Sequence, residues 1–134
     1  MDLRDIMSRN VEVVNASASL EDAAIKMKNL DVGLIPVCDG DRLQGVLTDR
    51  DITIRATANG RDPKITKVTD VMTTDMPTVT GDTLLGDLMD VMATSSLPIS
   101  VIDEQRRIKG IVIRGAVIGA LAGSRDSLNE MESD

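Results

Sequence analysis

Apolar and polar residues in the first third of the chain are spaced as in an amphipathic helix. From Leu20 the apolar positions recur three or four residues apart, at Ala23, Ala24, Met27 and Leu30, which places them on one helical face. Ser and Asp residues within segment 17–22 supply capping oxygens and an acidic first turn. We therefore expect a helix that begins near residue 20 and ends between 29 and 33, after a short extended run at 11–14.

Two apolar runs that follow this helix are typical of paired strands. Residues 33–38 and 43–47 are short and apolar, and Asp39-Gly40-Asp41 between them favours a hairpin turn. Segment 48–51, which reads Thr-Asp-Arg-Asp, then offers capping oxygens for a second helix that continues through residue 55. The pattern predicts the order strand, helix, strand, strand, helix.

The same order recurs at an offset of 65 residues. Asp5-Ile6-Met7-Ser8 aligns with Asp70-Val71-Met72-Thr73, and after a slip of one residue Val37-Cys38-Asp39 aligns with Val101-Ile102-Asp103. The second copy predicts strands at 78–80, 97–102 and 108–113 and helices at about 83–93 and 117–121. We divide the chain into repeat 1 (residues 1–61), a connector (62–69), repeat 2 (70–123) and a flexible acidic tail (124–134).

The amino-acid composition removes several classes of function. The chain has no Phe, Tyr or Trp, so it has no aromatic platform to stack the bases of single-stranded nucleic acid. Its net charge is -7 and its 15 Lys and Arg form no basic stripe, which argues against nucleic acid as a partner. With no His and one Cys, a His-dependent nucleophile, an ordinary zinc site and an internal disulfide are excluded.

The sequence also bears on where in the cell the protein acts. No apolar run approaches the length of about 18 residues that suggests a membrane span, and the first residues do not read as a secretion signal. We therefore expect a cytoplasmic protein without direct membrane insertion.

Cys38 ends an apolar run, and we interpret it as a buried structural thiol, with a redox switch as the alternative.

The duplicated order of elements carries a resemblance to a known family. With Gly45-Val46-Leu47-Thr48-Asp49-Arg50-Asp51 closing the first copy, residues 6–121 resemble the cystathionine β-synthase (CBS) domain pair, also called the Bateman module. The resemblance implies an α/β (α+β) fold of two CBS repeats. Each repeat would be a small three-stranded sheet with two helices, and the two would pack with pseudo-twofold symmetry. It also implies two clefts that can hold an adenosine ligand.

The resemblance assigns a ligand-binding role to the start of the second helix. Asp51 would accept hydrogen bonds from both ribose hydroxyls, Thr48 would bind ribose or phosphate, and Arg50 would favour phosphate. The other wall of this cleft would come mainly from repeat 2, at Met76, Pro77, Thr78, Leu97, Pro98 and Ile99. The alternative is that Thr48 and Asp51 only cap the helix.

Repeat 2 departs from the pattern at the corresponding position. It reads Ile113-Arg114-Gly115-Ala116, so the carboxylate that would bind ribose is missing. We expect a degenerate second site whose residues would be Val11, Val13, Gly33, Leu34, Pro36 and Arg114, with Arg114 still able to hold a phosphate. One good site per chain is therefore expected.

These features predict a regulatory ligand-binding module and no enzyme. The ligand would be an adenine nucleotide, AMP, ADP or ATP, with no cofactor required, and the module would form a homodimer through helix faces that carry Ile25, Ile118 and Leu121. Asp49 and Asp51 could suggest acid–base chemistry, but paired Asp residues at a helix start are usually caps.

An alternative follows from residues 107–123. They resemble the C-terminal tail of the ATPase subunit of glycine betaine/proline ABC importers, although the chain has no Gly-rich phosphate loop. The alternative function is therefore an ionic-strength or cyclic-dinucleotide sensor of an osmolyte ABC importer.

Overall fold

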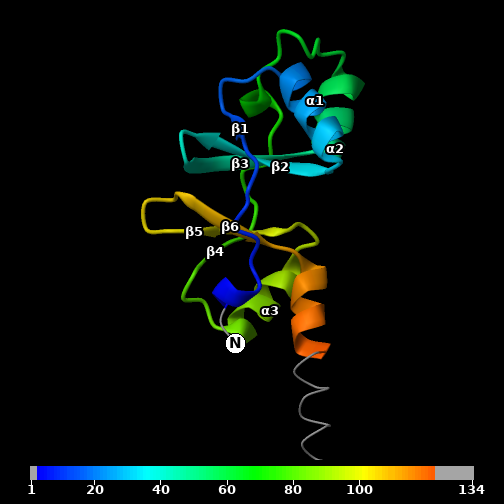
Figure 1. Cartoon of the computed structure of the whole chain (residues 1–134). Helices are drawn as coiled ribbons and strands as arrows, with labels where there is room; N and C mark the ends of the chain where they lie inside the picture. The colour runs from blue at the N-terminus through cyan, green and yellow to red at the C-terminus, as the bar shows by residue number, and fades with distance from the viewer. Residues whose placement is uncertain (1–2, 123–134) are drawn as a thin grey trace, which may run out of the picture. The chain divides into compact units, whose positions relative to one another are not determined.

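The computed structural model describes residues 3–122 of the chain, and within them the backbone forms two compact units (Figure 1). One unit comprises residues 12–76 and 105–108, and the other comprises residues 3–11, 77–104 and 109–122. The units therefore do not follow the linear repeats, because the first residues of the chain belong with repeat 2 and the tip of a repeat 2 hairpin belongs with repeat 1. The expected acidic tail, 124–134, lies outside the described residues.

The sheet of the first unit contains β1 (Val14–Asn15), β2 (Leu34–Asp39) and β3 (Arg42–Thr48) in that spatial order. β1 runs parallel to β2, whereas β2 and β3 form an antiparallel hairpin. The predicted strand at 11–14 is wrong in its bounds, since pairing with β2 covers only residues 14 and 15. That short pairing also leaves Pro36, which has no backbone N–H, without a β1 partner in the middle strand.

The first helix, α1 (Leu20–Leu30), confirms the predicted amphipathic segment. The Ser19 side chain caps it by accepting the backbone N–H of Asp22 at 3.1 Å. Its buried face supplies three residues to a core shared with the sheet and the later helical segment: Leu20, Ala23 and Met27 against Ile35, Val37, Leu47 and Ala56. Burial of these apolar side chains is the main source of stability in this unit.

The second predicted helix is a continuous helical segment in which the hydrogen-bond pattern changes twice. It begins as α2 (Asp49–Asp51), widens to the π-helix η2 (Ile52–Ala56), and tightens to the 3-10 helix η3 (Thr57–Asn59) before Gly60 ends it with φ 69°. A further 3-10 turn, η4 (Val68–Asp70), lies in the segment that leads to repeat 2. π-helical turns are rare and occur often at functional sites.

The second unit repeats this plan. It contains η1 (Leu3–Asp5), β4 (Thr78–Thr80), α3 (Leu85–Thr94), β5 (Ile99–Ile102), β6 (Ile108–Val112) and a helical segment at 114–122. β4, β5 and β6 form a three-stranded sheet in that order. Its core joins η1, the strands and both helices: Leu3, Val79, Leu88, Met92, Ile99, Val101, Val112 and Val117. The prediction of two three-stranded sheets in a mixed α+β fold is confirmed.

Gly45 lies where the chain after η4 crosses β3. Val46 and Thr73 exchange two backbone hydrogen bonds, of 2.9 and 2.8 Å. A Cβ atom at Gly45 would lie 2.6 Å from the Thr73 carbonyl oxygen and 2.8 Å from the Met72 sulfur. Gly110 is placed in the same way in the second unit, with the Ser8 carbonyl oxygen 2.8 Å from a Cβ. Both repeats thus depend on glycine for the same close approach.

Cys38 is fully buried in β2. Burial, with a smaller contribution from the negative charge of Asp41, raises the pKa of the Cys38 thiol to about 11. The thiol is therefore protonated at neutral pH and shielded from oxidants. This supports the interpretation of Cys38 as a structural residue.

None of the helices within residues 3–122 combines the length and the hydrophobicity that a membrane-spanning helix requires.

Candidate ligand-binding site

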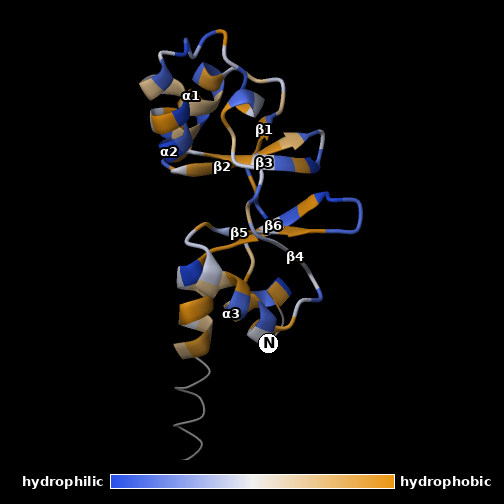
Figure 2. Cartoon of the chain, turned by 180° about the vertical axis from the view of Figure 1, so that it is seen from behind, coloured by the Kyte–Doolittle hydropathy of each residue, from blue (hydrophilic) through white to orange (hydrophobic). Residues whose placement is uncertain are grey.

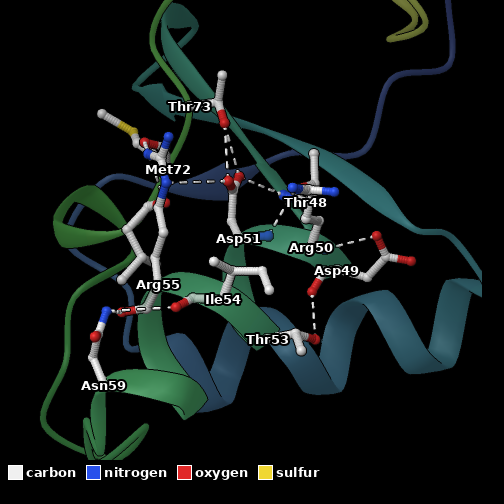
Figure 3. Close-up of polar contacts among 11 residues, drawn as sticks. Thr48, Asp49, Arg50, Asp51, Thr53, Ile54, Arg55, Asn59, Met72 and Thr73 are labelled. Carbon is white, nitrogen blue, oxygen red and sulfur yellow. Dashed lines mark hydrogen bonds and ion pairs between the residues drawn. The ribbon is translucent and has the colours of Figure 1, made fainter.

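The end of β3 and the start of α2 hold Thr48 and Asp51 in a reciprocal cap (Figure 3). The Thr48 hydroxyl accepts the backbone N–H of Asp51 at 3.0 Å, and the Asp51 carboxylate accepts the backbone N–H of Thr48 at 3.0 Å. This is a capping box, which satisfies two backbone donors at the helix start. Thr48 and Asp51 therefore do cap the helix, and the two oxygens of the Asp51 carboxylate together offer about four acceptor positions, so the cap does not use them all.

Thr73 supplies a further bond to the same carboxylate. Its hydroxyl oxygen lies 3.0 Å from Oδ1 and 3.0 Å from Oδ2 of Asp51, so it faces both oxygens. Figure 3 shows this hydroxyl directed at the carboxylate from the segment that follows η4. The two residues are 22 positions apart in the sequence, and the backbone bonds between Thr73 and Val46 hold them together.

Arg55 pairs with Asp51 one helical turn later. Its Nε lies 3.7 Å from Asp51 Oδ1, and its Nη1 donates to the Met72 carbonyl oxygen at 3.0 Å. The Asp51 side chain is 7% exposed and the Arg55 side chain 54% exposed. The buried carboxylate is thus bound to a hydroxyl, a backbone N–H and a partly solvated cation, so its burial is compensated by polar partners.

The groups of this cluster can form hydrogen bonds to a ligand. The carboxylate can accept hydrogen bonds, and Thr48, whose oxygen accepts from Asp51, can still donate its own hydroxyl hydrogen to a ligand. Arg50 is exposed on the first helical turn, beside Asp49. Among residues 3–122, no group of three or more acidic or cysteine side chains is placed to hold a metal ion.

The other predicted residues of the first cleft divide between the units. Met76 is buried in the same unit as Asp51. In the second unit, β4 pairs with β5 so that Thr78 faces Ser100, and the Ser100 N–H donates to the Pro77 carbonyl oxygen at 3.3 Å. This brings the start of β4 beside the start of β5, where the remaining predicted residues follow one another: Leu97 and Pro98, both half-buried, and Ile99, which is buried.

Several residues of the predicted second site already have structural partners. The Val13 carbonyl oxygen accepts Lys26 Nζ at 2.6 Å, and the Gly33 carbonyl oxygen accepts the Asp49 N–H at 2.9 Å. Arg114 Nη2 donates to the Met92 carbonyl oxygen in α3 at 2.7 Å. A cation at the end of a helix is favoured by the helix dipole, so the guanidinium has a structural role there. The other predicted residues are Val11 and Leu34, half-buried, and Pro36, buried.

Thr73 and Arg55 are the two residues of the cluster that sequence analysis missed. Thr73 was used only to define the repeat, because nothing local in the sequence links it to Asp51. The contact between Arg55 and Asp51 was predictable from the sequence, because an Asp and an Arg four residues apart on a helix are neighbours. At the offset of 65 residues, Thr48, Asp51 and Arg55 correspond to Ile113, Ala116 and Ala120, so the second unit lacks these three polar groups, whereas Thr73 corresponds to Ser8, which keeps the hydroxyl.

Comparison with known proteins identifies one family. A family model described as the CBS domain matches residues 3–56 and again residues 68–123. CBS domain-containing protein YhcV of Bacillus subtilis (strain 168) is 37% identical over 113 residues, which are 84% of this chain and 80% of that protein.

Two other similarities bear on function. Glycine betaine transport ATP-binding protein OpuAA of Bacillus subtilis (strain 168) is 36% identical over 125 residues, 92% of this chain, but the chain spans only 28% of that protein's length. The crystal structure of Arabidopsis thaliana CBSX2 in complex with AMP aligns with a TM-score of 0.77 at 26% identity and covers 92% of this chain and 98% of that one.

Proposed function

The chain belongs to the CBS-domain family as a pair of CBS repeats, and from this premise we propose that it is a regulatory module that binds an adenine nucleotide, AMP, ADP or ATP. The signal would be a conformational or oligomeric change on binding, which requires that the nucleotide bind two states with different affinity. The pair is a regulatory module, and nothing in the described residues points to catalysis.

The observation that carries the proposal is the buried carboxylate of Asp51 at the start of α2. It is fixed by the capping box and surrounded by hydroxyl and guanidinium groups. The two oxygens of a carboxylate can accept one hydrogen bond each from the two neighbouring hydroxyls of a ribose. The AMP complex of CBSX2 supports an adenine nucleotide as the ligand of such a pair. In this proposal Thr48 and Arg50 bind the ribose or phosphate.

The proposed cleft is completed by apolar residues that would enclose the adenine: Met76, Pro77, Thr78, Leu97, Pro98 and Ile99. The second site would be weak. It lacks a carboxylate at Ala116, and the Arg114 guanidinium is bonded to α3. We therefore propose one nucleotide per chain, with no cofactor required, in a protein that acts in the cytoplasm.

Isothermal titration tests this proposal. Purified protein is titrated with AMP, ADP, ATP, S-adenosylmethionine and cyclic di-AMP, and its concentration is set by amino-acid analysis because the chain has no Tyr or Trp. We expect one adenine mononucleotide to bind with a stoichiometry near one per chain. If none of the mononucleotides produces heat or a thermal shift at millimolar concentration, the nucleotide proposal is wrong.

A second function is favoured by the similarity to OpuAA over most of this chain. In that case the module would sense ionic strength or a cyclic dinucleotide for an osmolyte ABC importer. Binding of cyclic di-AMP alone in the titration, or a salt-dependent change in assembly without any ligand, would support this function over the first.

Apolar grooves on the helices support a homodimer. One groove lies between α1 and the segment from η2 to Pro63, and includes Leu20, Ala24, Ile25 and Ile52. The other lies between α3 and segment 114–122, which is largely hydrophobic in Figure 2, and includes Met89, Val117, Ile118 and Leu121. Ile25 is 49% and Ile118 58% exposed. We propose that a second copy of the chain covers these faces.

The variant Ile25→Glu is expected to convert the dimer to a monomer, because a charge would be buried in an apolar interface. Sedimentation velocity at micromolar protein measures this directly. Ile65→Glu is the matched control, since Ile65 is 80% exposed and is not among the residues that line the groove, and it should leave the sedimentation coefficient unchanged. A wild-type protein that sediments as a monomer would refute the proposed dimer.

A further inference from the structure

The Thr73 hydroxyl occupies the side of the Asp51 carboxylate that a ribose would need. An oxygen at 3.0 Å from both Oδ1 and Oδ2 lies opposite the gap between the two acceptors. Two neighbouring ribose hydroxyls would approach the same side to donate one hydrogen bond to each oxygen. Thr73 and the ribose cannot both hold this position.

The remaining acceptor positions of the carboxylate are largely taken. Oδ2 accepts the Thr48 N–H at 3.0 Å, and Oδ1 faces Arg55 Nε at 3.7 Å. Asp51 as a whole residue is only 6% exposed. A ribose therefore cannot bind by adding to the existing contacts, and it has to replace one of them. The replaceable contact is the hydroxyl, because the N–H bond belongs to the helix cap and the Arg55 guanidinium is also held by the Met72 carbonyl oxygen.

We infer that Thr73 sets the nucleotide affinity of this site by competing with the ribose hydroxyls for the Asp51 carboxylate. The inference rests on the proposed function. Two backbone hydrogen bonds to Val46 fix the position of Thr73, so its hydroxyl is held opposite the carboxylate in the free protein and leaves by rotation of its side chain. The second unit, which lacks the carboxylate, has Ser8 at the corresponding position.

Removal of the hydroxyl tests the competition. Thr73→Val keeps the shape of the side chain and removes the donor, so AMP should bind roughly fivefold to tenfold more tightly than to the wild type, the amount expected when one competing hydrogen bond is lost. Thr73→Ser retains the hydroxyl and should bind AMP within about twofold of the wild type. Thr80→Val is the matched control, because the Thr80 hydroxyl donates to the Asp82 carboxylate in the other unit, and it should not change the affinity.

A second ligand separates competition from a general structural effect. 2′,3′-Dideoxy-AMP has no ribose hydroxyls to compete with Thr73, so the gain on Thr73→Val should disappear with it. An equal gain with both ligands, or an AMP affinity of Thr73→Val that is equal to or weaker than that of the wild type, overturns the inference and leaves the proposed function standing. If neither the wild type nor Thr73→Val binds AMP at millimolar concentration, AMP binding is refuted and the inference falls with it.

Discussion

Gly45→Ala is expected to lower the free energy of unfolding by about 3 kcal/mol, because the added methyl group would overlap backbone that has no room to move. A Cβ at this position would lie 2.6 Å from the Thr73 carbonyl oxygen, which is fixed by the hydrogen bond to Val46. The crossing segment would have to shift away from β3. Urea unfolding followed by circular dichroism at 222 nm measures the loss.

Gly86→Ala is the control for this substitution. Gly86 lies in the first turn of α3, and a Cβ there would meet no atom within 4 Å. Alanine is the better helix former, so this variant should gain up to about 1 kcal/mol. Equal urea midpoints for Gly45→Ala and the wild type would show that β3 and the crossing segment are not in close contact. Gly45→Ala should also move Thr73 relative to Asp51. A change in the nucleotide affinity of this variant would therefore be a second measure of the displacement.

Asp51→Ala is expected to weaken nucleotide binding by at least about 100-fold, since two hydrogen bonds to a charged acceptor are lost and each contributes about 1.5 kcal/mol or more. The same change removes one half of the capping box, which stabilises the helix start by about 1 kcal/mol. A loss of binding therefore has to be separated from a loss of folding. Calorimetric titration with AMP measures the first and urea unfolding the second.

Two variants make this separation. Asp51→Asn keeps one oxygen that can accept the Thr48 N–H, so the fold should be retained while one ribose hydroxyl meets a donor instead of an acceptor. Asp49→Ala removes the neighbouring carboxylate, which is exposed and accepts the backbone N–H of Arg50, and should change the affinity less than threefold by our estimate for an exposed charge. Wild-type affinity in Asp51→Asn and Asp51→Ala would reduce Asp51 to a helix cap.

The repeat and the periodicity of apolar residues were sufficient to predict both sheets and the helices α1 and α3. These elements depend on side-chain patterns within one segment, such as Ala23 and Met27 on the same helical face. Such patterns can be recognised from the sequence alone. The cap at Thr48 and Asp51 is equally local, because its two residues are three positions apart. Local chemistry therefore predicted the position of the proposed site.

Features that depend on distant segments could not be read from the sequence. Thr73 reaches Asp51 only because β3 and the crossing segment pair across Gly45. The π-helical turn of η2 has no separate residue pattern, since Ile52 and Ala56 also fit an α-helix that packs on the core. The hydrogen bond from Arg114 to the Met92 carbonyl oxygen joins residues 22 positions apart, so the sequence alone did not show that this arginine has a partner in α3. Each of these depends on tertiary packing.

The bond between Arg114 and the Met92 carbonyl oxygen bears on the shape of the dose–response curve. With this arginine engaged in the helix pair and no carboxylate at Ala116, the chain is expected to carry one working site. A single site fills hyperbolically with ligand concentration and has no neighbour in the same polypeptide to cooperate with. A response steeper than hyperbolic would therefore have to arise from coupling between chains, and its Hill coefficient would give a lower limit on the number of chains that respond together.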